Sequence, residues 1–154
     1  MSQPQAGQPA PHFEGFNQKG EKVSLKDFAG HKLVLYFYPK DDTPGCTAEA
    51  CSLRDNHDVF LSKGLKVVGI STDSVKSHDK FVNKFNLPFD LIADEDQTIV
   101  NNYGVWIEKS MYGRKYMGTN RVTFLIDEQG VVQHVIEKVD TKAHAEQVLK
   151  VAGW

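Results

Sequence analysis

The chain has 154 residues, a length that suits a single domain with its own hydrophobic core. Hydrophobic residues make up 40% and charged residues 25%, and the net charge is −2. This composition is ordinary for a globular protein and argues against an electrostatic binder of nucleic acid or membranes. No apolar run is long enough to cross a bilayer. Two cysteines are too few for a secreted disulfide scaffold, but Cys46 and Cys51 lie only five residues apart.

The first ten residues have neither the basic nor the apolar region of a secretory signal. We therefore expect a flexible polar lead over residues 1–10, a single folded domain over residues 11–154, and a reducing, cytoplasmic setting. No repeat, linker or low-complexity tract divides the chain.

Hydrophobic periodicity and turn signals predict alternating strands and helices, followed by a hairpin and a last helix. The predicted strands are 13–17 and 22–25 (a hairpin), 32–38, 65–72, 90–93, 121–126 and 131–136. The predicted helices are one from residue 46 that stops at Gly64, then 77–85, 97–103 and 141–152, the last with Thr141 at its N-cap. Residues 104–120 are expected to be irregular. This order predicts an α/β sandwich with a mixed central sheet, flanked by helices, and an N-terminal β-hairpin.

Cys46 follows a buried strand and a turn, and it opens a predicted helix. The unpaired N–H groups of a first helical turn favour negative charge, so a thiol there loses its proton more easily than a free thiol. Thr43 is near enough for its hydroxyl to bond the sulfur or a substrate oxygen. However, Cys46 also shares a helical stripe with Ala50 and Leu53, so a buried, inert cysteine remains the alternative.

Cys51 falls on the other side of the same helix, among Arg54 and Asp55. Five residues of helix place two Cα atoms roughly 8.6 Å apart, whereas a disulfide requires about 4.4–6.8 Å. If Cys46 and Cys51 pair, the helix between them must unwind. We therefore expect oxidation of Cys46 to trigger local unfolding of the first turns.

The spacing Pro39-x-x-x-Thr43-x-x-Cys46 resembles the proline–threonine–cysteine signature of peroxiredoxins. The longer segment 43–55, TPGCTAEACSLRD, is similar to the peroxiredoxin Q, or bacterioferritin-comigratory-protein, subfamily. The resemblance runs from about Pro11 to the last helix and includes 116–127, YMGTNRVTFLID. It implies a thioredoxin-like fold and thiol-dependent reduction of hydrogen peroxide and organic hydroperoxides, without a cofactor.

The resemblance also implies residue roles. Cys46 would be the peroxidatic residue that becomes a sulfenic acid, and Cys51 would resolve it as an intramolecular disulfide. Thioredoxin or a similar dithiol reductant would then restore both thiols. Arg121 would hold Cys46 as thiolate and orient the peroxide, Thr43 would hydrogen-bond the peroxide, and Pro39 would shape the pocket. A resolving cysteine in the same chain suggests a monomer.

Several charged or metal-ligating side chains remain outside this site. Glu49 either pairs with an arginine or is an ordinary exposed helix residue, so we leave it outside the catalytic set. His57 is expected to be half-buried, and the other histidines are expected to face solvent: His12, His31, His78, His134 and His144. No spacing joins histidines and cysteines into a metal site, so no metal is expected.

Two other classes of function remain to be weighed. A thioredoxin-like disulfide exchanger would use Cys-x-x-Cys, whereas four residues intervene here, and it would have a later proline, whereas none follows Pro88. A non-enzymatic interaction protein could use the aromatic residues Trp106, Tyr112 and Tyr116 as a partner surface, although such loops more often pack over a site. Peroxide consumption by wild type and Cys46→Ser separates these classes.

Overall fold

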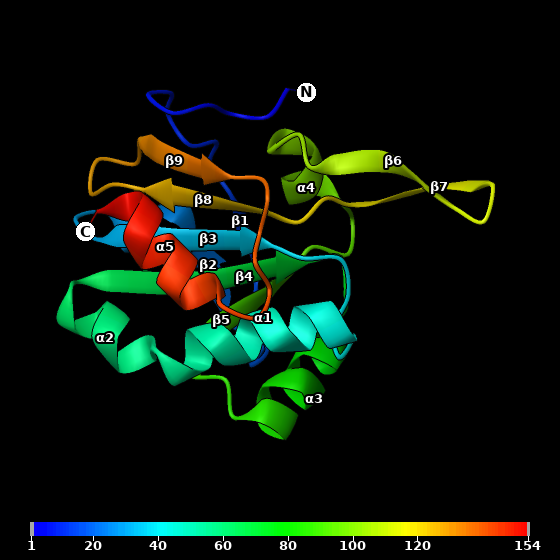
Figure 1. The fold of residues 1–154 in the computed structure, drawn as a ribbon, viewed down its shortest axis with the longest axis horizontal. Coiled ribbons are helices and arrows are strands. Elements are labelled where there is room, and N and C mark those ends of the chain that lie inside the picture. The colour runs from blue at the N-terminus through cyan, green and yellow to red at the C-terminus, as the bar shows by residue number, and fades with distance from the viewer. Residues whose placement is uncertain (1, 154) are drawn as a thin grey trace.

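A seven-stranded mixed sheet forms the centre of the computed structural model, which describes residues 2–153 (Figure 1). Its strand order is β2-β1-β5-β4-β3-β8-β9. Strands β3, β4 and β5 are parallel, and the other neighbouring pairs are antiparallel. The strands are β1 (Glu14–Phe16), β2 (Lys22–Ser24), β3 (Lys32–Phe37), β4 (Leu65–Ser71), β5 (Asp90–Ala93), β8 (Val122–Ile126) and β9 (Val132–Ile136). This arrangement confirms the predicted α/β sandwich, its mixed sheet and its N-terminal hairpin.

Helices cover both faces of this sheet (Figure 1). Helices α1, α2, α3 and α5 pack on one face, and α4 and the short 3-10 helix η1 pack on the other. Their bounds are η1 (Leu25–Phe28), α1 (Pro44–Asp55), α2 (His57–Ser62), α3 (Val75–Phe85), α4 (Thr98–Asn102) and α5 (His144–Ala152). None of the helices in the described part of the chain combines the length and apolarity needed to cross a membrane.

Strand β3 is buried on both faces because it lies inside the sheet between two helical layers. Its residues Leu33, Leu35 and Phe37 join the core on the α4 side. Val34 and Tyr36 join the opposite core, which also contains Cys46. Burial on both faces explains the nearly continuous apolar sequence of this strand, and it places α1 over the end of β3.

The predicted helix from residue 46 differs from the structure at both of its ends. Helix α1 begins at Pro44 with Thr43 as its N-cap, because proline is well tolerated in the first helical turn. It ends at Asp55, and after Asn56 the separate helix α2 begins. The apolar periodicity continues across this break, so it did not reveal where the backbone leaves the helix.

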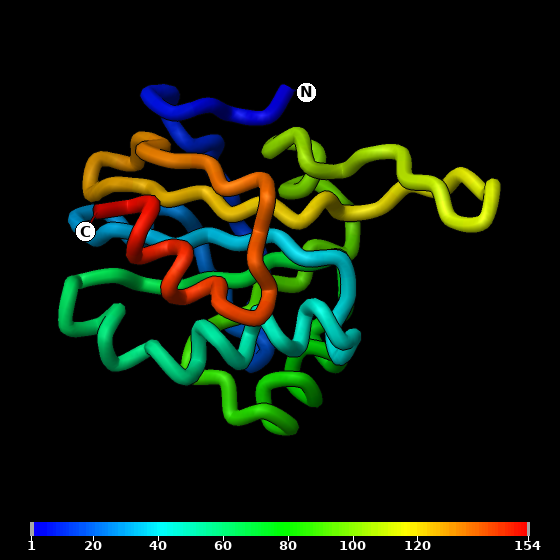
Figure 2. Tube along the Cα trace, viewed as in Figure 1, coloured from blue at the N-terminus to red at the C-terminus, as the bar shows by residue number. Residues whose placement is uncertain are grey.

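Residues 104–120 were expected to be irregular, and this prediction is wrong. They form an antiparallel hairpin of β6 (Trp106–Met111) and β7 (Arg114–Thr119), which projects from the body (Figure 2). The two turn residues, Tyr112 and Gly113, both have positive φ angles, 53° and 78°, as a tight hairpin turn requires. The apolar residues do not alternate with polar ones because most of the hairpin is exposed on both faces.

The start of α5 also differs from the prediction. The helix begins at His144 with Ala143 as its N-cap, so Thr141 does not cap it. The backbone N–H of Ala145 instead donates to the hydroxyl of Ser52 in α1, at 3.1 Å. A group from another helix therefore satisfies part of this N-terminus, and local sequence contains no sign of it.

The N-terminal segment lies along β9. Gly7 and Ala10 donate backbone hydrogen bonds to Val132 and Gly130, at 2.7 and 2.9 Å, and Val132 donates to Gln8 at 2.9 Å. Residues 7–10 of the predicted lead are therefore tied to the sheet. Met1 of that lead and Trp154 of the predicted domain lie outside the described residues.

Candidate active site

Cys46 lies in the first turn of α1, as predicted, where backbone N–H groups have no helical partner. Only 1% of the residue is exposed. It packs in the core between α1 and the end of β3, where Tyr36 and Tyr38 belong to the same cluster. The thiol therefore lies at the positive end of a helix dipole and is shielded from bulk water.

Arg121, just before β8, is the cation nearest to this thiol. Its Nη2 lies 3.4 Å from Cys46 Sγ, and its Nη1 donates to Glu49 Oε1 at 2.7 Å. Burial opposes the charge of the guanidinium, but Cys46 and Glu49 outweigh burial and raise the pKa of Arg121. Gly45 leaves room for this approach, since a Cβ there would lie 3.1 Å from Arg121 Nη2. Cys46 and Arg121 are 75 residues apart in sequence and meet as predicted.

Glu49 belongs to this cluster, although the sequence left it outside the catalytic set. Its side chain is fully buried and forms an ion pair with Arg121. Burial raises the pKa of Glu49 to about 7, and Arg121 works in the opposite direction. The signal available in the sequence was its spacing of three residues from Cys46, which places both side chains on one helical face. An ordinary exposed glutamate can have the same spacing, so only the burial of Glu49 in the structure distinguishes it from a surface residue.

Thr43 and Pro39 lie in the loop between β3 and α1. The Thr43 hydroxyl donates to the carbonyl oxygen of Lys40 at 2.8 Å, so its oxygen remains able to accept a hydrogen bond. Pro39 is half-buried at the bend that follows β3. Both residues therefore flank the helix start that contains Cys46.

Cys51 lies in the same intact helix, and both cysteines are free thiols. It is half-buried rather than exposed. Since α1 is continuous from Pro44 to Asp55, the helical spacing keeps the two cysteines too far apart to bond in this conformation.

The prediction that five histidines face solvent is wrong for His78 and His144, which are both fully buried. His12 and His31 are exposed, as predicted. His134 is half-buried rather than exposed, and His57 is half-buried, as predicted. Each fully buried ring satisfies its polar atoms within the protein, and sequence pattern alone does not reveal such partners.

His78 belongs to a buried hydrogen-bond network that holds the loop before α1. Its Nδ1 lies 2.6 Å from Asp41 Oδ2, and Asp41 also accepts from Tyr38 Oη at 2.6 Å and Ser77 Oγ at 2.8 Å. The backbone N–H of Asp41 donates to Asp73 Oδ2 at 2.8 Å. These contacts fix the loop that contains Pro39 against the start of α3. Asp41, Asp73 and His78 lie close enough together to be candidate metal ligands, and in this structure hydrogen bonds within the protein occupy all three side chains.

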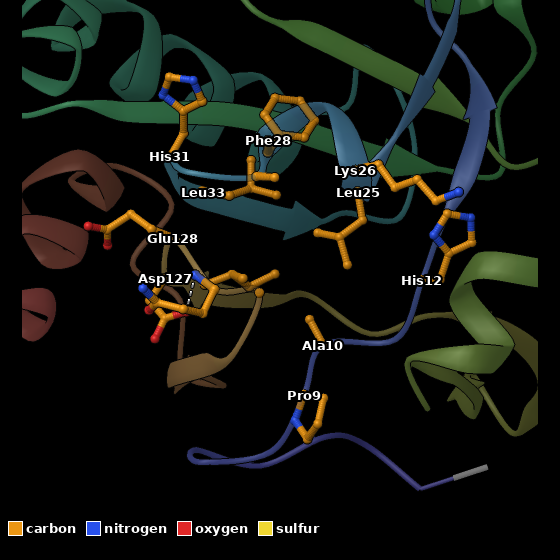
Figure 3. A pocket seen from close by; sticks show the side chains of 14 residues that line it. Pro9, Ala10, His12, Leu25, Lys26, Phe28, His31, Leu33, Asp127 and Glu128 are labelled. Carbon is orange, nitrogen blue, oxygen red and sulfur yellow. Dashed lines mark hydrogen bonds between the residues drawn. The ribbon is translucent and has the colours of Figure 1, made fainter.

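An open pocket of about 570 Å³ lies at the other end of β3 (Figure 3). Apolar side chains such as Leu25, Phe28 and Leu33 line it, and His31 lies at its rim. None of the five predicted site residues lines this pocket. The predicted site residues gather instead at the opposite end of β3, where α1 begins.

Comparison with known proteins agrees with this geometry. The model of the AhpC/TSA family matches residues 6–135. The chain is 50% identical over 145 residues to the putative peroxiredoxin Bcp of Coxiella burnetii, which covers 94% of this chain and 96% of that protein. It is 45% identical over 149 residues to peroxiredoxin Bcp of Escherichia coli K12, covering 97% and 96%.

A solved structure is similar over most of its length. It is that of the bacterioferritin comigratory protein of Xanthomonas campestris, described for its alkyl peroxide reduction activity. It superimposes with a TM-score of 0.86 at 39% identity, covering 92% of this chain and 90% of that chain. The predicted resemblance and the thioredoxin-like fold are therefore confirmed. The chain belongs to the AhpC/TSA family, in its peroxiredoxin Bcp, or bacterioferritin-comigratory, branch.

Proposed function

We propose that Cys46 is the peroxidatic residue of this thiol peroxidase, and that Arg121, Thr43 and Pro39 form its peroxide site. One observation carries the proposal: Arg121 Nη2 lies 3.4 Å from a cysteine sulfur in a first helical turn. A fixed cation and free helical N–H groups both favour the thiolate, which is the nucleophilic form.

In the first step the Cys46 thiolate attacks the terminal oxygen of a hydroperoxide. An S–O bond forms and the O–O bond breaks, so sulfur loses two electrons and the peroxide gains them. The hydroperoxide proton moves to the departing oxygen, which leaves as an alcohol or water. Arg121 donates hydrogen bonds to the peroxide oxygens as charge develops on them, and the Thr43 oxygen accepts from the hydroperoxide O–H.

The first step leaves a sulfenate on Cys46, and one further proton converts it to the sulfenic acid. In the second step the Cys51 thiol attacks the sulfur of this sulfenic acid. An S–S bond forms, the S–O bond breaks, and the oxygen leaves as water with the thiol proton. Because α1 separates the two residues, its first turns unwind during this step. A dithiol protein such as thioredoxin then reduces the disulfide by exchange.

Substrate and setting follow from the same chemistry. The described activity of the Xanthomonas relative supports organic hydroperoxides as substrates, with hydrogen peroxide as the smallest member of the class. Two free cysteines and thiol recycling suit a reducing cytoplasm. An intramolecular disulfide requires no second copy, so we propose a monomer without a cofactor.

The test is steady-state peroxide consumption driven by thioredoxin, thioredoxin reductase and NADPH. Cys46→Ser is expected to lose activity to background because the nucleophile is removed. Cys51→Ser is expected to lose turnover but still consume about one peroxide per chain, because only the resolving thiol is absent. Equal consumption by wild type and Cys46→Ser would overturn the proposal. Multiple turnovers by Cys51→Ser would show that Cys51 is not the resolving cysteine.

A further inference from the structure

Glu49 and His144 form a buried pair behind Arg121 that the proposed reaction does not yet use. Both side chains are fully buried, and His144 Nε2 lies 3.4 Å from Glu49 Oε2. The other carboxyl oxygen, Oε1, accepts from Arg121. Among the described residues, Oε2 has no hydrogen-bond partner. A buried carboxyl oxygen without a donor is unusual and requires an explanation.

The protonation of His144 follows from Gln147, whose amide orientation is fixed by the backbone. Its Oε1 accepts from the N–H of Asp140 at 2.9 Å, and its Nε2 donates to the carbonyl of Lys138 at 2.8 Å. Reversing the amide would place donor against donor and acceptor against acceptor. The same Oε1 lies 2.9 Å from His144 Nδ1, so Nδ1 must carry a hydrogen.

With Nδ1 protonated, Nε2 of a neutral His144 can only accept. It then accepts from the hydroxyl of Thr123, whose Oγ1 lies 2.8 Å away. In that state the Nε2 lone pair also faces Glu49 Oε2, and an ionised carboxylate there has no donor. One additional proton resolves this conflict, either on Glu49 Oε2 or on His144 Nε2.

We propose that Glu49 and His144 hold one exchangeable proton behind the peroxide site, and that this proton balances the charge of Cys46 through Arg121. His144 is a positioning residue in this scheme, since it touches neither Cys46 nor the peroxide. The inference rests on the proposed role of Cys46 as the peroxidatic thiolate. It assigns His144, expected from sequence to face solvent, a part in that chemistry.

The charges around the pair support this coupling. With the proton absent, Arg121 faces two anions, the Glu49 carboxylate and the Cys46 thiolate. With the proton present, on Glu49 or on His144, the pair has no net charge, so it competes less with the thiolate for the positive charge of Arg121. A proton on the pair therefore favours the thiolate, and by reciprocity the thiolate favours the proton on the pair.

Other groups that face the pair do not replace this proton. Burial and the neighbouring anions hold the pKa of Tyr36, on β3, well above its ordinary value, so its hydroxyl stays neutral. Burial lowers the pKa of His144 and Arg121 acts in the same direction, whereas the hydrogen bond of Gln147 and the charge of Asp140, before α5, oppose this shift. Lys109, on β6, adds positive charge near Arg121 and Cys46, with its own pKa lowered chiefly by burial.

Burial also shifts the pKa values of Glu49 and His144 in opposite directions. Burial raises the pKa of Glu49 to about 7, whereas burial lowers the pKa of His144 from its ordinary value. A proton shared between such groups belongs to the pair rather than to either residue. The proton is therefore exchangeable near neutral pH.

The proton balance of the reaction shows how the exchangeable proton of Glu49 and His144 would be used. Thiolate, hydroperoxide and the Cys51 thiol together yield the disulfide, an alcohol and hydroxide, so one proton is needed to release water instead. The negative charge of Cys46 disappears in the same sequence. Without the thiolate the Glu49–His144 pair binds its proton less tightly. The pair therefore releases a proton at the stage where the reaction consumes one.

The first test follows the ring of His144 by NMR against pH, in reduced wild type and in Cys46→Ser. If the thiolate and the pair are coupled, the pair is expected to titrate about one pH unit higher in wild type. The measurement needs no turnover and leaves His144 in place. Identical titrations in the two proteins, or no titration of His144 between about pH 5 and 9, would overturn the inference.

A second test fixes the pair in each of its two states, in a Cys51→Ser background that leaves one thiol. His144→Gln replaces the imidazole with an N–H donor to Glu49 Oε2, and this hydrogen bond favours the ionised carboxylate. The midpoint of the thiolate absorbance at 240 nm is then expected to move up by about one pH unit. Glu49→Gln is permanently uncharged, and its midpoint is expected to move down.

Opposite shifts distinguish this role from structural damage, which would move both variants in the same direction. His31→Gln is the matched control, because His31 is exposed and lines the distant pocket; it is expected to change nothing. Shifts of equal sign in His144→Gln and Glu49→Gln would overturn the inference. Failure of wild type to consume peroxide would instead overturn the proposed function, and the NMR titration separates the two.

Discussion

Glu49 is the residue whose environment differs most from its sequence context. A carboxyl on a helix is normally exposed, because burying its charge is costly unless a partner is present. Arg121 supplies that partner at 2.7 Å, and Glu49 in turn fixes the guanidinium that faces Cys46. The buried Glu49–Arg121 ion pair therefore serves to position the guanidinium rather than to stabilise the fold.

The raised pKa of Glu49 predicts a pH dependence of stability. A carboxyl whose pKa is about 7 in the folded state and 4.5 otherwise binds its proton more tightly when folded. The stabilisation of the folded state by this bound proton is present below about pH 4.5 and is lost as pH rises through 7. Between these limits we expect wild type to lose on the order of 3 kcal/mol relative to Glu49→Gln, since each pKa unit corresponds to about 1.4 kcal/mol.

Urea denaturation at several pH values between 4.5 and 7.5 measures this difference. The lowered pKa of His144 acts in the opposite direction, removing stability as pH falls below 6.5. Because His144 and Glu49 are neighbours, the comparison measures Glu49 together with its effect on His144. Glu146→Gln, an exposed change in α5, is the control and should follow wild type. Parallel curves for wild type and Glu49→Gln would contradict the prediction.

Among the elements, α1 combines two demands that conflict. Its inner face, with Cys46, Glu49, Ala50 and Leu53, belongs to the buried interior and keeps the helix docked on the sheet. Its Cys51 can reach Cys46 only if the same helix opens. Ser52 adds a further tie, since its hydroxyl accepts from the first turn of α5. Opening should therefore be confined to the turns before this anchor.

Amide hydrogen exchange of residues 48–54 tests this opening, because in the helix these N–H groups donate to the carbonyls of residues 44–50, in the turns before Ser52. In the reduced protein these amides are expected to exchange slowly, and after oxidation to the intramolecular disulfide at least about tenfold faster. Peroxide-treated Cys51→Ser is the matched control, because it oxidises at Cys46 without forming the disulfide and should keep slow exchange. Equally slow exchange in the reduced and disulfide forms would contradict the predicted unwinding.

For the whole molecule, topology decides where chemistry is possible. The parallel strands β3, β4 and β5 end at one edge of the sheet, and the loop after β3 leads directly into α1. Antiparallel β8 begins at that same edge, which places Arg121 beside Cys46. This is the edge at which α/β sheets generally bind their ligands.

An intramolecular resolving cysteine predicts that the molecule works as a monomer. Sedimentation analysis is expected to give a mass near 17.3 kDa in both the reduced and the disulfide form. The exposed hairpin tip is the main surface that could oppose this, since Tyr112 is 98% exposed and Met111 56%. A dimer in wild type that Tyr112→Ser abolishes would contradict the prediction and assign the contact to the hairpin.

The sequence by itself determined the fold class, most element positions and the residues that flank Cys46. These features are local: apolar runs fix buried strands, the turn after β3 locates the start of α1 to within two residues, and Pro39, Thr43 and Cys46 lie within one short segment. Periodicity reports burial only where one face is apolar. It therefore missed the hairpin β6–β7, which is exposed on both faces, and the break at Asn56.

The tertiary structure alone decided the partners of buried polar groups. The sequence left Glu49 open between an arginine partner and an exposed helix position, and it predicted that His78 and His144 face solvent. Each is buried because a residue distant in sequence supplies its hydrogen bond or counter-charge: Arg121 for Glu49, Asp41 for His78, and Thr123 for His144. Burial of a charge depends on a partner, and the fold rather than the local sequence brings that partner near.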